Sequence, residues 1–238
     1  MWSIGRSETL NLAADLPVPI EIRPMRSARR LRLRYDEVRG MLKLTCPART
    51  SRRAALAWAL DQREWIEGQL ARSLPGEPFV SGAAIPFDDR NVRLVWAADE
   101  PRVPRLVGDE LRSGGPAAGF ERRIAVHLKR VATETMSNDV AEFAAAARVA
   151  VRSVTIGDAA TRWGSCSSDQ RIRLNWRLIL APSPVRRYVV AHEVDHLVHM
   201  NHGPEFKALE ARLFGPGLAE AKTNLRRIGP RLRRFGRR

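Results

Sequence analysis

Four of the five histidines in this chain lie between His192 and His202. The segment opens with H-E-V-D-H, which matches H-E-x-x-H, a pattern typical of zinc-binding helices in metallopeptidases. Residues i and i+4 share a helix face, so the rings of His192 and His196 can reach one metal ion. Glu193 lies about 100° further round the helix, where its carboxylate can take a proton from an attacking water. The spacing therefore predicts a zinc hydrolase with Glu193 as general base.

The third metal ligand has two candidates, His202 and His199. A catalytic zinc ion usually has three protein ligands and one water. A straight helix would place His199 at i+7 from His192, on the same face. The sequence favours a helix end near Asn201, because asparagine tolerates the left-handed conformation and Gly203-Pro204 stops a helix. We therefore expect His202 to turn back to the metal, with His199 as the alternative. All four histidines together would instead close a structural zinc site.

Two neighbouring residues have open roles. Tyr188 lies one turn before His192, so its hydroxyl can reach an oxyanion or its ring can pack in the core. Asp195 lies between the two helix histidines. Its carboxylate can orient a metal-bound histidine, or it can be a solvated group on the helix surface.

A helix must present these residues, and the sequence indicates where it begins and which face it buries. Ser183-Pro184 offers an N-cap and a proline in the first turn. Val190, Val194 and Leu197 recur at i, i+4 and i+7, which predicts a core-facing stripe. The histidines then lie on another face, toward a cleft.

The residues just before this helix predict a β-hairpin, formed by residues 161–167 and 171–176. An exposed strand beside a zinc cleft can hold an extended peptide through main-chain hydrogen bonds. Trp163, Gly164 and Ser165 are the candidates for this substrate strand. Their alternative role is a tight turn closed by a core tryptophan.

The rest of the chain alternates short β-like and helical segments. Leu31, Leu33 and Tyr35 alternate with arginines, and a turn near Gly40 predicts a hairpin with residues 42–46. The other expected elements are a helix over 50–72, short strands within 76–115, a helix over 120–148 with a break at 137–138, a strand over 151–156, a short helix that ends at 215–217 and a helix over 218–227.

The segment from Arg162 to Phe206 resembles the YgjP-like zinc metallopeptidase family. The matching words are R-W-G-S-C-S at 162–167, I-R-L-N-W-R-L-I-L-A-P at 172–182, Y-V-V-A-H-E at 188–193 and N-H-G-P-E-F at 201–206. A looser match extends upstream through residues 20–47 and 50–72. One departure is V-D at 194–195, where relatives commonly have L-A.

This resemblance implies an α+β, zincin-like fold with an N-terminal β-hairpin and helix, a small mixed sheet and an H-E-x-x-H active-site helix. It implies Zn²⁺ held by His192, His196 and His202, with Glu193 as general base. It also implies kinship with the SprT and Wss-type proteases, which act on proteins crosslinked to DNA.

The size of the chain predicts one compact domain, which we place at residues 20–228, with an N-terminal extension over 1–19 and a basic tail over 229–238. The resemblance implies that this domain is the zincin-like metallopeptidase domain. No apolar run is long enough to span a membrane, and the N-terminus does not resemble a signal peptide. With only two cysteines, Cys46 and Cys166, a disulfide framework is not expected, which favours the cytoplasm.

The net charge is +15, and arginine supplies 37 of the 41 basic residues. These arginines gather near both ends of the chain, over residues 23–39 and 226–238. Arginine suits phosphate recognition, so nucleic acid is a possible partner, although solvated charge is the simpler explanation.

The leading hypothesis is a zinc metallopeptidase that acts on a protein or peptide. The alternatives are hydrolysis of another amide and a nucleic-acid-associated zinc protein, either a DNA-linked protease or a non-catalytic binding module. The sequence does not indicate the oligomeric state.

Overall fold

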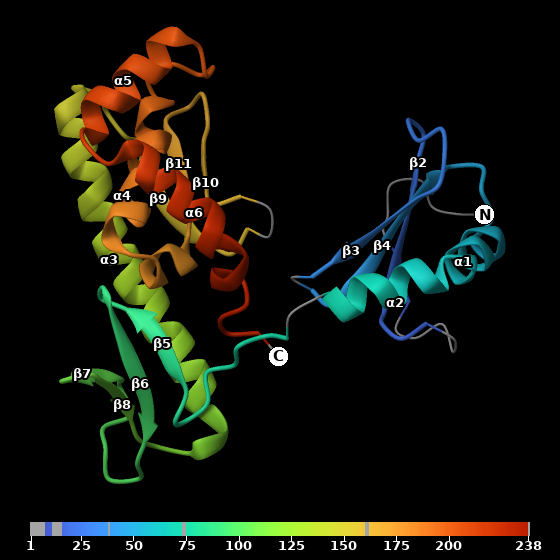
Figure 1. The fold of residues 1–238 in the computed structure, drawn as a ribbon, viewed down its shortest axis with the longest axis horizontal. Helices are drawn as coiled ribbons and strands as arrows, with labels where there is room; N and C mark the ends of the chain where they lie inside the picture. Colours follow the sequence, from blue (N-terminus) through green and yellow to red (C-terminus); the bar gives the residue numbers. More distant parts are fainter. Residues whose placement is uncertain (1–7, 11–15, 38, 73–74, 160–161, 238) are drawn as a thin grey trace. The chain divides into compact units, whose positions relative to one another are not determined.

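The structure is a computed structural model that describes residues 8–10, 16–37, 39–72, 75–159 and 162–237. Contacts divide the chain into two compact units, residues 1–75 and 76–238, and each has its own hydrophobic core. Helices and small sheets occur in both units (Figure 1), so the α+β class is confirmed. The ranges expected for the extension, the domain and the tail stay predictions.

The first unit combines a four-stranded sheet with two helices. Its strand order is β1 (Glu8–Leu10), β2 (Ile20–Met25), β4 (Met41–Pro47) and β3 (Arg32–Asp36). The expected hairpin is confirmed, because β3 pairs antiparallel with β4 and Leu33 lies opposite Leu44. Gly40 has a φ of 62°, which the turn between these strands requires. The helix expected over 50–72 is divided at Gln62 into α1 (Arg52–Asp61) and α2 (Arg63–Arg72).

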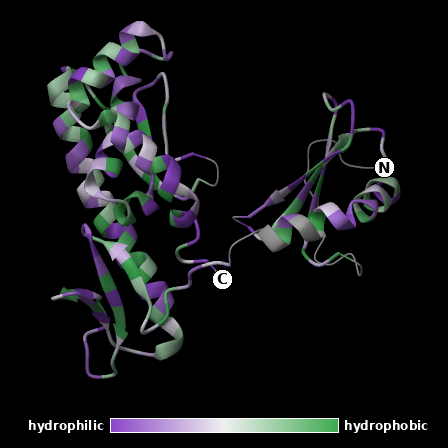
Figure 2. Ribbon diagram, viewed as in Figure 1, coloured by the Kyte–Doolittle hydropathy of each residue, from purple (hydrophilic) through white to green (hydrophobic). Residues whose placement is uncertain are grey.

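The second unit contains two further sheets. The first has the order β5 (Ala84–Phe87), β6 (Arg90–Trp96), β8 (Glu110–Ser113) and β7 (Arg105–Val107). Along β6 hydrophilic residues alternate with the buried Val92 and Leu94 (Figure 2). The second sheet has the order β10 (Gly164–Cys166), β11 (Arg171–Asn175) and β9 (Ser153–Gly157). Strand β10, which forms the second expected hairpin with β11, therefore lies at an edge of its sheet.

A long helix, α3 (Phe120–Ala147), runs along this unit (Figure 1). The break expected at 137–138 is wrong, because Met136, Val140 and Phe143 continue one buried face through that point. Helix α4 (Ser183–Asp195) packs against α3 and carries His192 and Glu193. The strand–helix order places β10, β11 and a buried 3₁₀ turn (Trp176–Leu180) immediately before α4.

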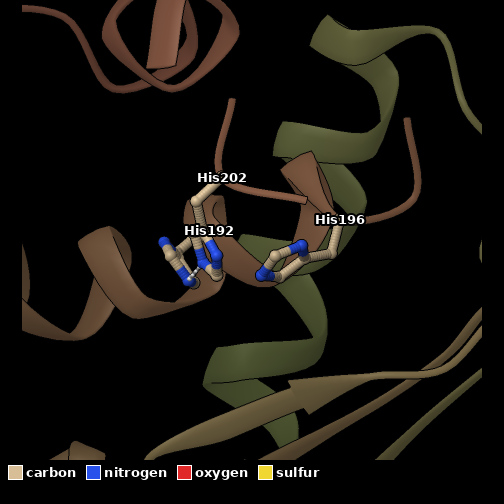
Figure 3. A group of neighbouring side chains, drawn as sticks. All are labelled: His192, His196 and His202. Atoms are coloured by element: carbon tan, nitrogen blue, oxygen red, sulfur yellow. Dashed lines mark hydrogen bonds between the residues drawn. The ribbon is translucent and has the colours of Figure 1, made fainter. Parts of the chain in front are cut away.

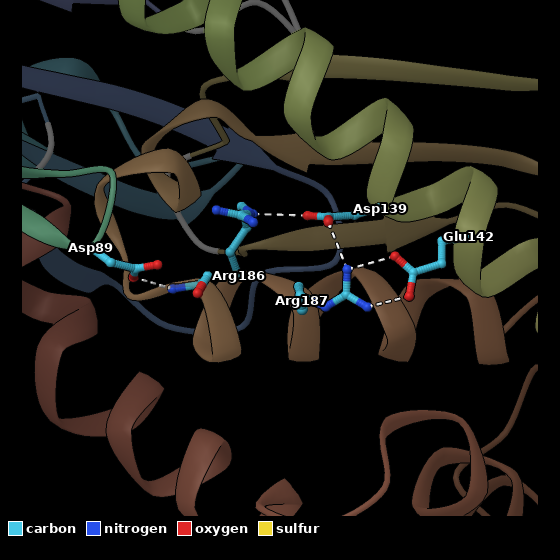
Figure 4. Close-up of polar contacts among 6 residues, drawn as sticks. Asp89, Asp139, Glu142, Arg186 and Arg187 are labelled. Atoms are coloured by element: carbon cyan, nitrogen blue, oxygen red, sulfur yellow. Dashed lines mark hydrogen bonds and ion pairs between the residues drawn. The ribbon is translucent and has the colours of Figure 1, made fainter. Parts of the chain in front are cut away.

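Two sets of polar contacts hold α4 in place: ion pairs with α3 and a hydrogen bond at its N-terminus (Figure 4). Asp139 on α3 accepts hydrogen bonds from Arg186 (2.8 Å) and Arg187 (3.1 Å), and Glu142 pairs with Arg187 through both of its oxygens. The expectation that Ser183 caps the helix is wrong. Ser183 is the first helical residue, and its N–H donates to the Asp89 carboxylate at 2.7 Å.

Two helices complete the unit, α5 (Pro204–Phe214) and α6 (Leu218–Leu232). Helix α6 continues beyond the end expected near Arg227, because Leu232 belongs to the core and Phe235 is buried just after it. Among the described helices, none is long and apolar enough to cross a membrane.

Candidate metal centre

The centre lies where α4 ends and the chain turns toward α5. The helix ends at Asp195, earlier than the sequence indicated, and His196 is its C-cap. The next turn is tight, since the N–H groups of Leu197 and Val198 donate to carbonyls three residues back. This early turn brings His202 close to the end of α4.

Three imidazole rings converge at this point (Figure 3). Candidate ligand atoms of His192, His196 and His202 all lie within 4.8 Å of one another. The Nε2 atoms of His192 and His202 are 3.2 Å apart. Ligand atoms about 2.0–2.1 Å from a tetrahedral zinc ion lie about 3.3 Å apart, so this spacing fits two neighbouring corners of a zinc site.

Hydrogen bonds at Nδ1 leave Nε2 of two rings free for the metal. Nδ1 of His192 donates to Oε1 of Glu210 at 2.9 Å, and Nδ1 of His196 donates to the carbonyl of His199 at 3.1 Å. Burial holds the pKa of His196 below its ordinary value, so this ring is neutral at pH 7 and able to bind a metal.

Glu210, which the sequence analysis missed, is almost fully buried on α5. Burial alone would raise the pKa of its carboxyl, but hydrogen bonds from His192 and Lys222 bring that pKa below its ordinary value. The ammonium of Lys222 on α6 donates to Oε2 at 2.6 Å. A signal was present in the sequence, because Glu210 falls among the apolar positions 206, 209 and 213 of an amphipathic helix.

Glu193 follows His192 on α4, and its side chain faces the edge strand β10. A Cβ atom at Gly164 would lie only 2.4 Å from the Oε1 atom of Glu193, so the carboxyl group fits only because position 164 has no side chain. Glu193 is 6% exposed. Burial raises the pKa of its carboxyl to about 7, against the opposing effect of the Arg162 charge.

The His199 ring lies outside the cluster of three imidazoles, and the Tyr188 ring packs against one member of it. The His199 ring lies 3.7 Å from the carboxylate of Glu205, and its contribution to the cluster is the backbone carbonyl that accepts from His196. The Tyr188 ring packs edge-on against His192 and Phe214. Burial raises the pKa of the Tyr188 phenol to about 12, so it stays protonated at neutral pH.

Asp195 has neither of its expected roles. Its side chain is fully buried, so it is not a solvated surface group. Neither carboxylate oxygen has a hydrogen-bond partner among the described residues, so it orients no histidine. Burial is the main cause that raises the pKa of Asp195 to about 7, and the negative charge of Glu210 raises it further.

The three residues expected to form a substrate strand lie at and just before β10. Trp163 packs against α6, with the Arg233 guanidinium 4.3 Å from its ring, so its side chain anchors the strand. Gly164 and Ser165 are in the strand itself. A cavity of about 370 Å³ lies alongside, lined by these residues together with Arg162 and Arg173.

The family model described as YgjP-like, metallopeptidase domain, matches residues 29–228 of this chain. The matched segment contains all three clustered histidines, Glu193 and Glu210. No curated protein shows a significant match to the sequence.

We predict that Glu210→Gln weakens metal binding about 10- to 100-fold, because the His192 ring loses its charged hydrogen-bond acceptor. Competition with a chromogenic zinc chelator at pH 7.5 measures this affinity. Glu205→Gln is the matched control, since Glu205 lies on the same helix and its side chain is 85% exposed. Equal affinities of the two variants would show that Glu210 does not position His192.

We predict that Asp195→Asn stabilises the metal-free protein by about 1 kcal/mol or more at pH 8, because it removes a buried charge that no group satisfies. The raised pKa means that the native state holds a proton that the unfolded state releases above its ordinary pKa of 3.8. The contribution of Asp195 to the free energy of unfolding of the wild type is therefore present at low pH and is lost as the pH rises toward 7. Urea unfolding of both proteins at pH 5 and 8 should show a larger advantage for the variant at pH 8. An advantage that does not grow with pH would contradict the prediction.

Proposed function

The chain belongs to the YgjP-like metallopeptidase family, and we propose that it is a zinc-dependent peptidase of zincin type. His192, His196 and His202 would hold the Zn²⁺ ion, and Glu193 would act as general base. The observation that carries this proposal is the convergence of three imidazoles at the end of α4, where the residue that follows His192 is the buried Glu193.

Each of these residues has a distinct task in peptide hydrolysis. A zinc ion bound here would lower the pKa of a coordinated water to about 7 and polarise the substrate carbonyl. The carboxylate of Glu193 takes the proton of the attacking water and passes it to the nitrogen of the leaving amine. Its raised pKa suits both halves of this transfer, because the group can accept and release a proton near neutrality.

The number of side chains in the cluster supports catalysis over a structural role for the metal. A structural zinc site usually has four protein ligands, whereas a catalytic site has three and keeps one position for water. Among the described residues the cluster contains three histidines, and the His199 ring lies beside Glu205 instead. Glu193 would also have no function beside a closed structural ion.

We propose that the substrate is a protein or peptide segment that binds in extended form along β10. This strand lies at the edge of the sheet, so one side of its backbone is not paired with another described strand. Main-chain hydrogen bonds there would hold a peptide with little dependence on its sequence. The contact between Gly164 and Glu193 would bring the bound peptide bond close to the general base.

We expect Glu193→Gln to retain zinc and to lower kcat for peptide hydrolysis by about 10²- to 10⁴-fold, because the amide cannot accept the proton of the attacking water. Mass spectrometry of fragments from a reduced, unfolded protein measures cleavage, and metal analysis measures the zinc content. Glu205→Gln should cleave like wild type. Equal cleavage by Glu193→Gln would exclude Glu193 as the base. Absence of new peptide termini in zinc-loaded wild type would favour another amide substrate or a binding module.

Gly164→Ala should lower kcat at least about tenfold, because the new methyl group displaces the Glu193 carboxyl from its present position. Zinc affinity should stay within about threefold of wild type, since the three atoms nearest to the new methyl group all belong to Glu193. Gly229→Ala is the control, because a methyl group there would meet its nearest atom at an ordinary 3.4 Å. Normal activity of Gly164→Ala would show that the close packing is not needed for catalysis.

A further inference from the structure

The sheet of the first unit presents a strongly basic face to solvent. Its other face carries the buried residues of the core, such as Ile22 and Leu44. On the outward face, the register sets Arg34 directly opposite Lys43, and Arg32 opposite Thr45. Thr45 in turn lies beside Arg23 of β2.

This basic face, defined by Arg23, Arg32, Arg34 and Lys43, continues into the loop between β2 and β3. That loop is strongly hydrophilic (Figure 2) and carries three exposed arginines, Arg26, Arg29 and Arg30. Among the described residues, no ion pair involves any of these six arginines. Only Lys43 has an acidic partner, the carboxylate of Asp36 at 2.7 Å.

The described arginines that follow Arg227 are different, because other groups of their own unit engage them. Arg231 and Arg234 pair with Glu77, and Arg237 pairs with Asp158. Arg233 lies over the ring of Trp163. The two basic ends of the sequence are therefore not equivalent, and the N-terminal one is free for an external anion.

The charges of this face are offset only in part within the unit. Lys43, which lies opposite Arg34, is paired with Asp36 and has Glu21 opposite it on β2. Arg23 and Arg32 lie beside Thr45 instead, with no acidic residue opposite them among the described strands. Neighbouring strands lie about 4.8 Å apart and alternate residues about 6.8 Å apart, so the charges form a regular array. A regular array of anions is the complementary surface.

We propose that this face binds the phosphate backbone of a nucleic-acid duplex. The guanidinium group matches a phosphate with two parallel hydrogen bonds, which favours phosphate over single carboxylates of an acidic protein. Single strands are usually bound through aromatic stacking. The aromatic side chain of β3, Tyr35, lies opposite Leu42 on the core side, so the face offers charge without a stacking platform. Binding is therefore independent of base sequence and of the peptidase proposal.

The test compares two triple variants of the full chain that have the same net charge. Arg23→Gln/Arg32→Gln/Arg34→Gln neutralises the basic face. Arg93→Gln/Arg122→Gln/Lys207→Gln neutralises three exposed cations of the second unit for which no ion pair is seen among the described residues. Fluorescence anisotropy with labelled 20-base-pair DNA and RNA duplexes measures affinity from 50 to 200 mM salt, and thermal unfolding checks that each variant is folded.

We expect the basic-face variant to lose roughly 100-fold in affinity at 0.1 M salt, and its log–log salt slope to fall by about 3. The control should change less than about threefold. Arg23→Lys/Arg32→Lys/Arg34→Lys should keep most of the affinity, because it keeps the charge. Equal affinities for the DNA and RNA duplexes would indicate that the protein recognises the phosphate backbone. Binding of only one of them would identify that duplex as the ligand. Equal losses in both Gln variants, or competition by poly-glutamate as strong as by duplex at equal charge, would overturn the proposal.

Discussion

The hydrogen bond from His192 to Glu210 is the interaction on which the candidate centre depends. It fixes the ring so that Nδ1 faces the protein and Nε2 faces the other two histidines. Glu210 can serve only because it is buried and because Lys222 holds its second oxygen. The position of the His192 ring therefore depends on the packing of two further helices, α5 and α6, against α4.

The local parts of this arrangement were predictable from the sequence. Alternation of apolar residues identified the hairpin at Gly40, and the i, i+4 spacing identified His192 and His196 as neighbours. The choice of His202 over His199 followed from residues that end a helix, and the structure does place His202 in the cluster. The exact helix end was not predictable, because the turn after Asp195 depends on tertiary packing and not on a glycine or proline.

Contacts between distant residues were beyond the reach of pattern reasoning. The cap of α4 comes from Asp89, which precedes Ser183 by 94 positions. The sequence pattern also predicted a free basic tail for the last arginines. It could not show their partners Glu77 and Asp158, which lie far away in sequence. In contrast, the mainly basic outer face of the first sheet follows directly from strand alternation once the register is known.

The long sequence separation between the parts of the centre has a consequence for biosynthesis. A ribosome releases the N-terminal unit first, and that unit has a core of its own. Lys222 is synthesised 30 residues after His192 (222 − 192), so a nascent polypeptide has the H-E-x-x-H residues before it has the support for them. Under the proposed function, hydrolytic competence would therefore follow the synthesis and packing of α6, which protects the part of the chain already made from its own activity.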